Sequence, residues 1–310
     1  MWHALSPRLA YGRGVNKQVV VCVVIASLAA SLGAMSCGGA LPPSPVGASS
    51  EPPAAFQPTA FGVTVSGKGR PVILIPCLGC PGSMWTPTVG HLGASVQTHV
   101  LTLSGFAGRP AIDKPLIATA RAELAVYIRD RHLDHPIVIG HSLGGFLVYW
   151  LAATEPELVG PIVVIDEPAG IATIAGVVDR AARQRDQWKA MAPADFPDAV
   201  RTFFAGMAND PARLDVLLRD IVRSDQRSFA DAYYELVSTD VRPDLAKIKA
   251  PLLAILADSE DQQEIAAQLA PVPHHEVVTL PHTKHMVMLD DPPAFYRALD
   301  SFLAAQPGTP

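Results

Sequence analysis

The sequence contains little charge: Asp, Glu, Lys and Arg make up 17% of its 310 residues, whereas hydrophobic residues make up 49%. Its first 36 residues contain no acidic side chain, so the remaining residues hold 29 acidic and 21 basic side chains, a formal charge of −8. Because nucleic-acid binding exploits a local excess of positive charge, nucleic acid is not an expected partner. The hydrophobic content is sufficient for one large core or two small ones.

Cysteine is scarce, and patterns typical of metal ligands are missing. The four cysteines are Cys22, Cys37, Cys77 and Cys80, of which only the last two are closely spaced. No second pair of ligands stands at a useful spacing from them, which argues against a metal site. No internal repeat divides the chain.

The residues near the N-terminus are organised like an export signal. The 17 residues from Val19 to Met35 are uncharged and mostly apolar, and Arg8, Arg13 and Lys17 precede them. This order is typical of a secretory signal, so we expect residues 1–36 to be a signal peptide. The stretch is also just long enough to span a bilayer, and an uncleaved signal anchor is therefore the alternative.

The end of this stretch, Leu32-Gly33-Ala34-Met35-Ser36-Cys37, resembles the lipobox of bacterial lipoproteins, in which the cysteine becomes the lipidated first residue. Lipoboxes usually have Leu where this chain has Ala34, and the segment also fits an ordinary cleavage site. The resemblance implies a lipid on Cys37 and a membrane-tethered protein of the bacterial cell envelope, whereas ordinary cleavage implies a periplasmic or secreted protein. Residues 37–60 are rich in Gly, Pro, Ser and Ala, which favours a flexible tether.

Beyond the tether, short β-branched runs alternate with helical patterns. The predicted strands are Val72–Ile75, Val100–Leu103, Ile137–Ile139, Ile162–Ile165, Leu252–Leu256 and Glu276–Leu280. Apolar residues at helical spacing predict helices over Leu116–Arg131 and Phe295–Phe302. Continuous apolar strands separated by helices imply a mostly parallel sheet covered on both faces. The fold class is therefore α/β, with a folded domain over residues 61–305.

One interval, from about residue 167 to residue 249, shows no convincing strand. Its amphipathic segments are Val177–Met191, Phe196–Ala208 and Ala212–Val222. We interpret the interval as a helical cap inserted between the strands that end at Ile165 and start at Leu252; extra helices on the far face of the sheet are the alternative. Apolar residues that either line a substrate pocket or form the cap's own core are Ile171, Ile174, Val177, Val178, Phe203 and Phe204.

The strongest motif is Gly140-His141-Ser142-Leu143-Gly144, which follows a buried strand and precedes a helix over Phe146–Thr154. In this context G-x-S-x-G predicts a tight strand-to-helix turn that presents a nucleophilic serine. Glycine on either side allows neighbouring backbone to approach closely. The helix N-terminus favours an anion that develops beside the hydroxyl.

A serine hydroxyl needs a base to take its proton, and the sequence offers ten histidines. In chain order the base of such a site follows the last strand, which leaves His282 and His285. We favour His285, because an apolar run, an acidic pair and proline follow it before the final helix. His282 stays the alternative, and His141, beside the serine, is interpreted as a packing residue.

A carboxylate must orient the histidine and stabilise the imidazolium. Asp166 follows the strand that ends at Ile165, and Glu260 or Asp261 follows the strand that begins at Leu252. The second location is the commoner one, but its usual Gly-x-x-Asp is replaced here by the residues 257–261, Ala-Asp-Ser-Glu-Asp. We therefore favour Asp166 and keep Glu260 and Asp261 as alternatives.

Together, the segment Ile75–Trp85, the serine turn and the His285 loop resemble the α/β-hydrolase superfamily. In that family the first long strand ends in His-Gly-x, and the backbone N–H groups of x and of the residue after the nucleophile bind the oxyanion. The resemblance implies that the N–H groups of Leu78 and Leu143 have this role. Cys77 replaces the usual glycine of the loop.

If export removes Cys22 and lipid takes Cys37, only Cys77 and Cys80 remain as thiols in an oxidising compartment. We expect either a disulfide between them around the oxyanion loop or two free buried thiols.

The predicted function is hydrolysis of a carboxylic ester or related acyl bond of a small, apolar substrate, with no cofactor. The same residues also suit peracid or haloperoxidase-like chemistry, thioester hydrolysis or cleavage of a carbon–carbon bond. A catalytically inactive, surface-tethered binding protein is the alternative of another class, because Cys77 and the altered Gly-x-x-Asp depart from the family pattern.

Overall fold

The computed structural model describes residues 55–306. The predicted signal peptide, Cys37 and residues 37–54 of the predicted tether lie outside the described residues, so export and lipidation stay predictions. Among the described residues, none of the helices has the length and apolar character needed to cross a membrane.

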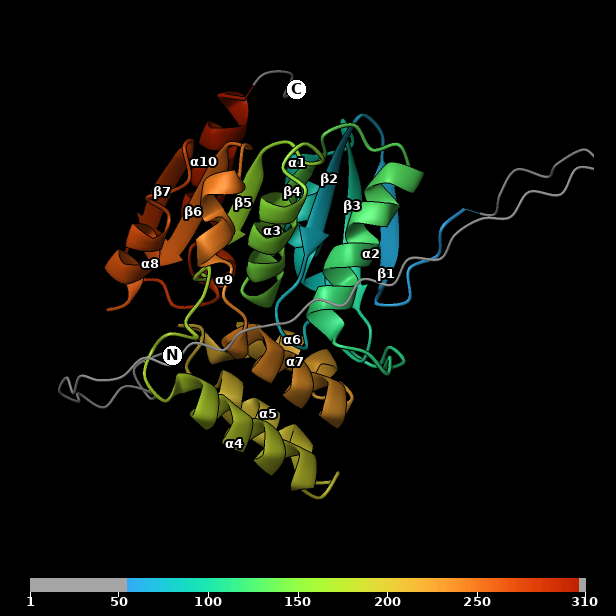
Figure 1. Cartoon of the computed structure of the whole chain (residues 1–310), viewed down its shortest axis with the longest axis vertical. Helices are drawn as coiled ribbons and strands as arrows, with labels where there is room; N and C mark the ends of the chain where they lie inside the picture. Colours follow the sequence, from blue (N-terminus) through green and yellow to red (C-terminus); the bar gives the residue numbers. More distant parts are fainter. Residues whose placement is uncertain (1–54, 307–310) are drawn as a thin grey trace, which may run out of the picture. The chain divides into compact units, whose positions relative to one another are not determined.

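A seven-stranded sheet forms the centre of the described part of the chain (Figure 1). Its order is β1-β3-β2-β4-β5-β6-β7, and every neighbouring pair is parallel except β1 with β3. The strands are β1 (Phe61–Gly67), β2 (Arg70–Ile75), β3 (Val96–Leu103), β4 (Ile137–His141), β5 (Ile162–Ile165), β6 (Leu252–Ala257) and β7 (His275–Leu280). The mostly parallel sheet predicted from the sequence is confirmed. The antiparallel edge strand β1 is an addition, and its exposed side chains explain why its sequence has no continuous apolar run.

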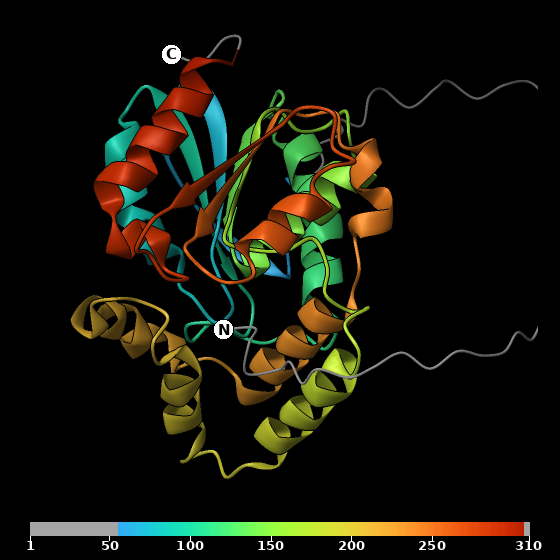
Figure 2. The same cartoon turned by 90° about the vertical axis from the view of Figure 1, so that its left-hand side faces the viewer.

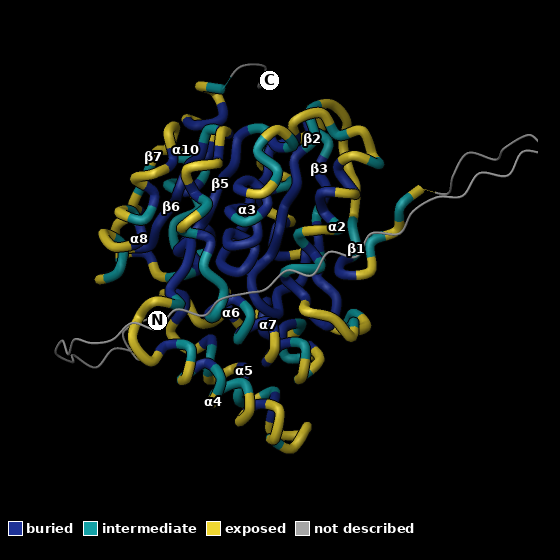
Figure 3. The backbone as a smooth tube through the Cα atoms, in the orientation of Figure 1, coloured by how far each residue is buried: buried dark blue, intermediate teal, exposed yellow. Residues whose placement is uncertain are grey.

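Helices cover both faces of this sheet, which explains the uninterrupted burial of β4, β5 and β6. In Figures 1 and 2, α2 and α3 lie on one face and α10 on the other. Figure 3 shows the central strands as the buried part of the chain. The helices outside the cap are η2 (Gly82–Trp85), α1 (Thr86–Leu92), α2 (Leu116–Asp130), α3 (Leu143–Thr154), α8 (Gln262–Gln268), α9 (Val287–Asp290) and α10 (Pro292–Ala304).

The predicted helical cap is confirmed. Its elements α4 (Val177–Ala190), α5 (Phe196–Phe204), α6 (Pro211–Ile221), α7 (Gln226–Ser238) and η3 (Arg242–Lys247) stand between β5 and β6 in the chain. In Figure 1, α4 to α7 lie beyond the carboxyl ends of the strands rather than on a face of the sheet, so the alternative arrangement was wrong.

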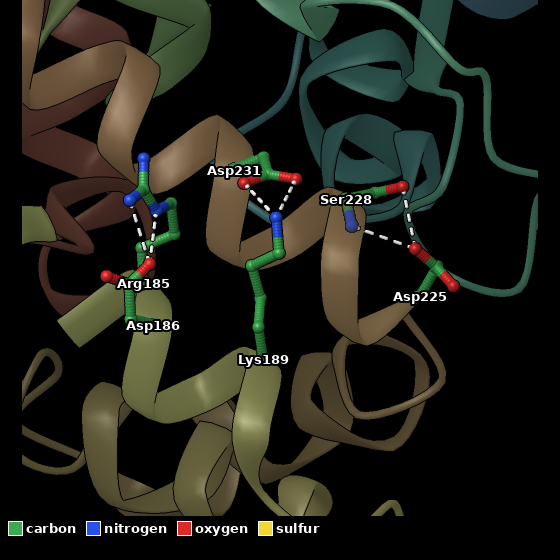
Figure 4. A network of polar contacts seen from close by, with 6 residues as sticks. All are labelled: Arg185, Asp186, Lys189, Asp225, Ser228 and Asp231. Carbon is green, nitrogen blue, oxygen red and sulfur yellow. Dashed lines mark hydrogen bonds and ion pairs between the residues drawn. The ribbon is translucent and has the colours of Figure 1, made fainter. Parts of the chain in front are cut away.

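Aromatic packing and an ion pair join α4 to α7. The Trp188 ring lies 5.4 Å from that of Phe229 and 5.1 Å from that of Tyr233, centroid to centroid. On the surface, Lys189 Nζ lies 2.8 Å from Asp231 Oδ1 (Figure 4). A surface pair of this kind contributes about 0 to 1 kcal/mol, so the aromatic contacts are the main link.

The two ends of the cap meet beside the sheet. Gly170 forms an antiparallel bridge with Asp240, and Val241 N–H donates to the main-chain oxygen of Ala169 at 3.1 Å. Gln268 of α8 accepts from Ala169 N–H at 3.0 Å and donates to Gly170 O at 3.2 Å. The cap therefore leaves and rejoins the sheet domain at one point.

Candidate active site

Ser142 occupies a strained turn between β4 and α3. Its φ of 54° and ψ of −124° are unusual for a residue with a side chain, and such a conformation costs about 1–3 kcal/mol. A Cβ on Gly140 would lie 2.2 Å from Gly144 O, and one on Gly144 would lie 2.3 Å from Ile75 O. Both glycines are thus required by close backbone contacts. Helix α3 begins at Leu143, directly after the serine and three residues earlier than predicted.

The loop that holds His285 is fixed against this turn. His141 Nε2 lies 2.9 Å from the main-chain oxygen of His285, and the two rings are 4.7 Å apart between centroids. The packing role expected of His141 therefore includes a hydrogen bond to the histidine loop. His282 is exposed, and its main-chain N–H donates to Asp258 Oδ2 at 3.0 Å. The structure thus brings His285 to the serine turn and leaves His282 on the surface of the loop.

Asp166 is the carboxylate that contacts His285. Its Oδ2 lies 2.7 Å from His285 Nδ1, and its Oδ1 accepts from Ala257 N–H at 2.8 Å. Its φ is 48°, so the strand end, like the serine turn, is held in an unusual conformation. Glu260 and Asp261 follow the neighbouring strand β6 and line a cavity there, whereas the contact with His285 Nδ1 comes from Asp166.

The environment keeps Asp166 ionised and His141 neutral. Burial alone would raise the pKa of Asp166, but the hydrogen bond and charge of His285 and the Ala257 N–H lower it overall. Burial, reinforced by the charge of His285, lowers the pKa of His141 to about 3. A neutral His141 that donates through Nε2 to His285 O has no proton on Nδ1.

Two main-chain N–H groups are available next to Ser142. Leu78 follows β2 and Leu143 follows β4, and these strands are parallel neighbours. Within residues 55–306, neither N–H group donates to another main-chain oxygen. The contact of Gly144 with Ile75 O and Pro76 O brings the two segments together. Both donors thus lie at the same edge of the sheet, where an oxyanion would form.

The segment 77–80 forms a buried turn closed by a disulfide. Cys80 N–H donates to Cys77 O at 3.0 Å, and Gly79 has a φ of 71°, which suits glycine at the third position of a type II turn. The sulfur atoms of Cys77 and Cys80 are bonded. Of the two arrangements expected for these cysteines, the structure has the disulfide around the Leu78 amide.

Comparison with known proteins decides the family. The family model described as "Alpha/beta hydrolase family" matches residues 72–298. The chain belongs to the alpha/beta hydrolase family.

Relatives of this hydrolase are similar at low identity. It is 27% identical over 177 residues to 3-oxoadipate enol-lactonase 2 of Acinetobacter baylyi, covering 56% of this chain and 66% of the relative. It is 25% identical over 262 residues to pimeloyl-[acyl-carrier protein] methyl ester esterase of Aeromonas salmonicida, covering 76% and 96%. An enol-lactonase structure from Burkholderia xenovorans LB400 matches with a TM-score of 0.68 and 20% identity, covering 79% of this chain and 96% of that one. The structural likeness shows a shared fold.

A cavity of about 390 Å³ opens beside the His285 and Asp166 side chains of the hydrolase. The cap contributes Phe203 and Met207 to its wall, and the segment Asp258–Asp261 and Lys284 form the opposite side. Of the apolar cap residues considered from the sequence, only Phe203 lines this cavity; Val177 and Phe204 are buried in the cap, and Ile174 is exposed. Among the described residues, no group of His, Cys, Asp and Glu has a metal-binding arrangement.

Sequence reasoning missed Glu167, which follows Asp166 and is 2% exposed. Burial and the negative charge of Asp166 raise its pKa well above the ordinary value, while a hydrogen bond from the Ser142 hydroxyl acts in the opposite direction. The signal available in the sequence was a second acid at the end of a buried strand, followed by Pro168.

Proposed function

We propose that this hydrolase cleaves carboxylic esters, or a closely related acyl bond, through an acyl-enzyme on Ser142. The observation that carries the proposal is the 2.7 Å contact between Asp166 Oδ2 and His285 Nδ1 beside the strained serine turn. Nucleophile, base and orienting carboxylate come from three different strand ends, as in other serine hydrolases.

In the proposed reaction, Ser142 Oγ attacks the carbonyl carbon while His285 Nε2 takes the hydroxyl proton. The N–H groups of Leu78 and Leu143 bind the resulting oxyanion. As the tetrahedral intermediate collapses, His285 gives the proton to the leaving alcohol. Water then attacks the acyl-enzyme with His285 as base, which releases the acid and restores Ser142.

Among the bonds that this fold can cleave, we propose an ester bond. The names of two relatives, an enol-lactonase and a methyl ester esterase, describe oxygen-ester substrates. The cavity combines an aromatic and a thioether side chain of the cap with a wall that holds Asp258, Glu260 and Asp261. Because apolar side chains of the cap line this cavity, we propose an ester with a small, mostly apolar acyl group.

Turnover of p-nitrophenyl esters of increasing acyl length tests the proposal. We expect activity that is abolished in Ser142→Ala, and a fluorophosphonate adduct on Ser142. Absence of both turnover and labelling in the wild type would favour the inactive binding protein instead. Thioester, carbon–carbon and peracid substrates, assayed in parallel, identify the preferred bond.

We also propose that the hydrolase is exported and tethered through Cys37. The basis is the charge order of residues 1–36 and the likeness of residues 32–37 to a lipobox. The intact mass of the mature protein tests this. A mass that begins at Cys37 with added acyl groups supports it, whereas an unmodified chain beginning at Cys37 or an uncleaved chain contradicts lipidation.

A further inference from the structure

Glu167 is a buried carboxyl group that the reaction above does not use. Its side chain is almost inaccessible, and in the described part of the chain no Lys or Arg forms a salt bridge with it. Burying an unpaired carboxylate is costly, and a carboxyl group in such a place normally stays protonated. The residues around Glu167 must therefore explain why a carboxyl group is buried there.

Those neighbours belong to the nucleophile turn. A Cβ on Gly145, in the first turn of α3, would lie 3.3 Å from Glu167 Cβ, so the side chain starts directly over this turn. Hydrogen bonding to the Ser142 side chain lowers the pKa of the Glu167 carboxyl group, against the larger effect of burial. Farther along α3, the hydroxyl of the fully buried Tyr149 has no hydrogen-bond partner among the described residues, and its pKa is raised by burial and by the charge of Glu167.

The titratable groups that act on Glu167 therefore come from two elements. Asp166 precedes it in the chain and carries a negative charge that opposes its ionisation, and the charge of Glu167 in turn raises the pKa of Tyr149 on α3. Neither supplies a positive charge. In the neutral form, the Glu167 carboxyl is a weak acceptor for the Ser142 proton. In the ionised form, it is a strong acceptor and competes with His285 for that same proton.

We propose that Glu167 is a positioning residue for Ser142, which leaves the serine hydroxyl free to turn to His285 when it is neutral and holds the hydroxyl away when it is ionised. The inference rests on the proposed nucleophilic role of Ser142. It predicts that the reactivity of Ser142 falls as the pH rises because Glu167 ionises, and not because of a change at His285 or Asp166.

The test compares wild type with Glu167→Gln, which keeps the size and hydrogen-bonding ability of the side chain but cannot ionise. Both kcat/KM for a p-nitrophenyl ester and the rate of fluorophosphonate labelling of Ser142 are measured from about pH 5.5 to about 9.5, with circular dichroism at each pH. We expect the wild-type rates to fall by about tenfold per pH unit once Glu167 ionises, and the Glu167→Gln rates to stay level. If Glu167→Gln does not fold, Glu167→Asp replaces it and is expected to shift the decline along the pH axis.

Glu235→Gln is the matched control. Glu235 on α7 is another carboxyl whose pKa is raised by burial, but its oxygens accept from Ile117 N–H and Ala118 N–H at the start of α2. This variant is expected to keep the wild-type pH profile. A Glu167→Gln profile identical to that of wild type, or the same change in both variants, overturns the inference while leaving the proposed function intact. Absence of turnover and labelling in the wild type overturns both.

Discussion

His141 Nε2 donates a hydrogen bond to the main-chain oxygen of His285 across 2.9 Å. The contact joins the residue that precedes the nucleophile to the residue proposed as the base, although 144 positions separate them in the chain. Because burial lowers the pKa of His141 to about 3, this donor is neutral at every pH at which the hydrolase is expected to work. His141 thus fixes the histidine loop without contributing a charge.

Replacement of His141 by leucine is expected to lower both stability and kcat. The variant leaves the His285 carbonyl without its donor, and an unsatisfied buried acceptor costs about 1–3 kcal/mol. Urea unfolding and ester turnover measure the two effects. An unchanged kcat in a destabilised variant would show that the hydrogen bond stabilises the loop without positioning the base.

Asp166→Asn is expected to lower kcat by about 10⁴, because the amide no longer favours the histidine tautomer that accepts the serine proton. The contact from Ala257 N–H to Oδ1 can persist in this variant, so the fold should survive. Glu260→Gln and Asp261→Asn serve as controls and should retain most of the activity. A large loss in either control, with Asp166→Asn active, would assign the orienting role to the other strand end.

The double variant Cys77→Ser/Cys80→Ser tests the closed turn. Without the covalent link the Leu78 amide is less well fixed, and we expect a loss in kcat of at most about 10² to 10³, the effect of losing one oxyanion donor. The mass of the wild-type protein after thiol blocking, with and without reduction, counts the free thiols. Blocking of Cys77 and Cys80 themselves before reduction, or full activity of the double variant, contradicts a stabilising disulfide.

Stability should also respond to pH through Glu167. Since its pKa is raised in the folded chain, the folded state holds a proton that the unfolded state releases above its ordinary value near 4.5. The free energy of unfolding is therefore highest below that value and declines as the pH rises toward the folded-state pKa. Asp166 has the opposite sign, because its lowered pKa adds stability above 3.8 that is lost in acid.

Urea unfolding of wild type and Glu167→Gln across pH measures this contribution. The decline should be smaller in the variant, and a part should remain because the pKa of Glu235 is raised as well. Equal slopes in the two proteins would mean that Glu167 titrates similarly in the folded and unfolded chains.

Local patterns were enough to predict the sheet, the cap and the serine turn. Uninterrupted apolar runs indicate strands that are buried on both faces. After such a run, G-x-S-x-G indicates a tight strand-to-helix turn in which glycines are needed because backbone lies close, as it does at Gly140 and Gly144. The edge strand β1 has no such run, because most of its side chains face solvent.

Contacts between distant segments could not be read in the same way. Asp166 and Glu260 both follow parallel strands that end at one edge, so chain position alone could not decide between them; the geometry at Ala257 and His285 distinguishes them. Glu167 was missed because its significance depends on burial against α3, which no local pattern reports.

The bridge between Gly170 and Asp240 has a consequence for how such a hydrolase can diversify. Because both ends of the cap meet there, β5 and β6 stay neighbours in the sheet although the whole cap stands between them in the chain. The strand ends that hold Ser142 and Asp166 can therefore be kept while the inserted segment that supplies Phe203 and Met207 to the cavity changes.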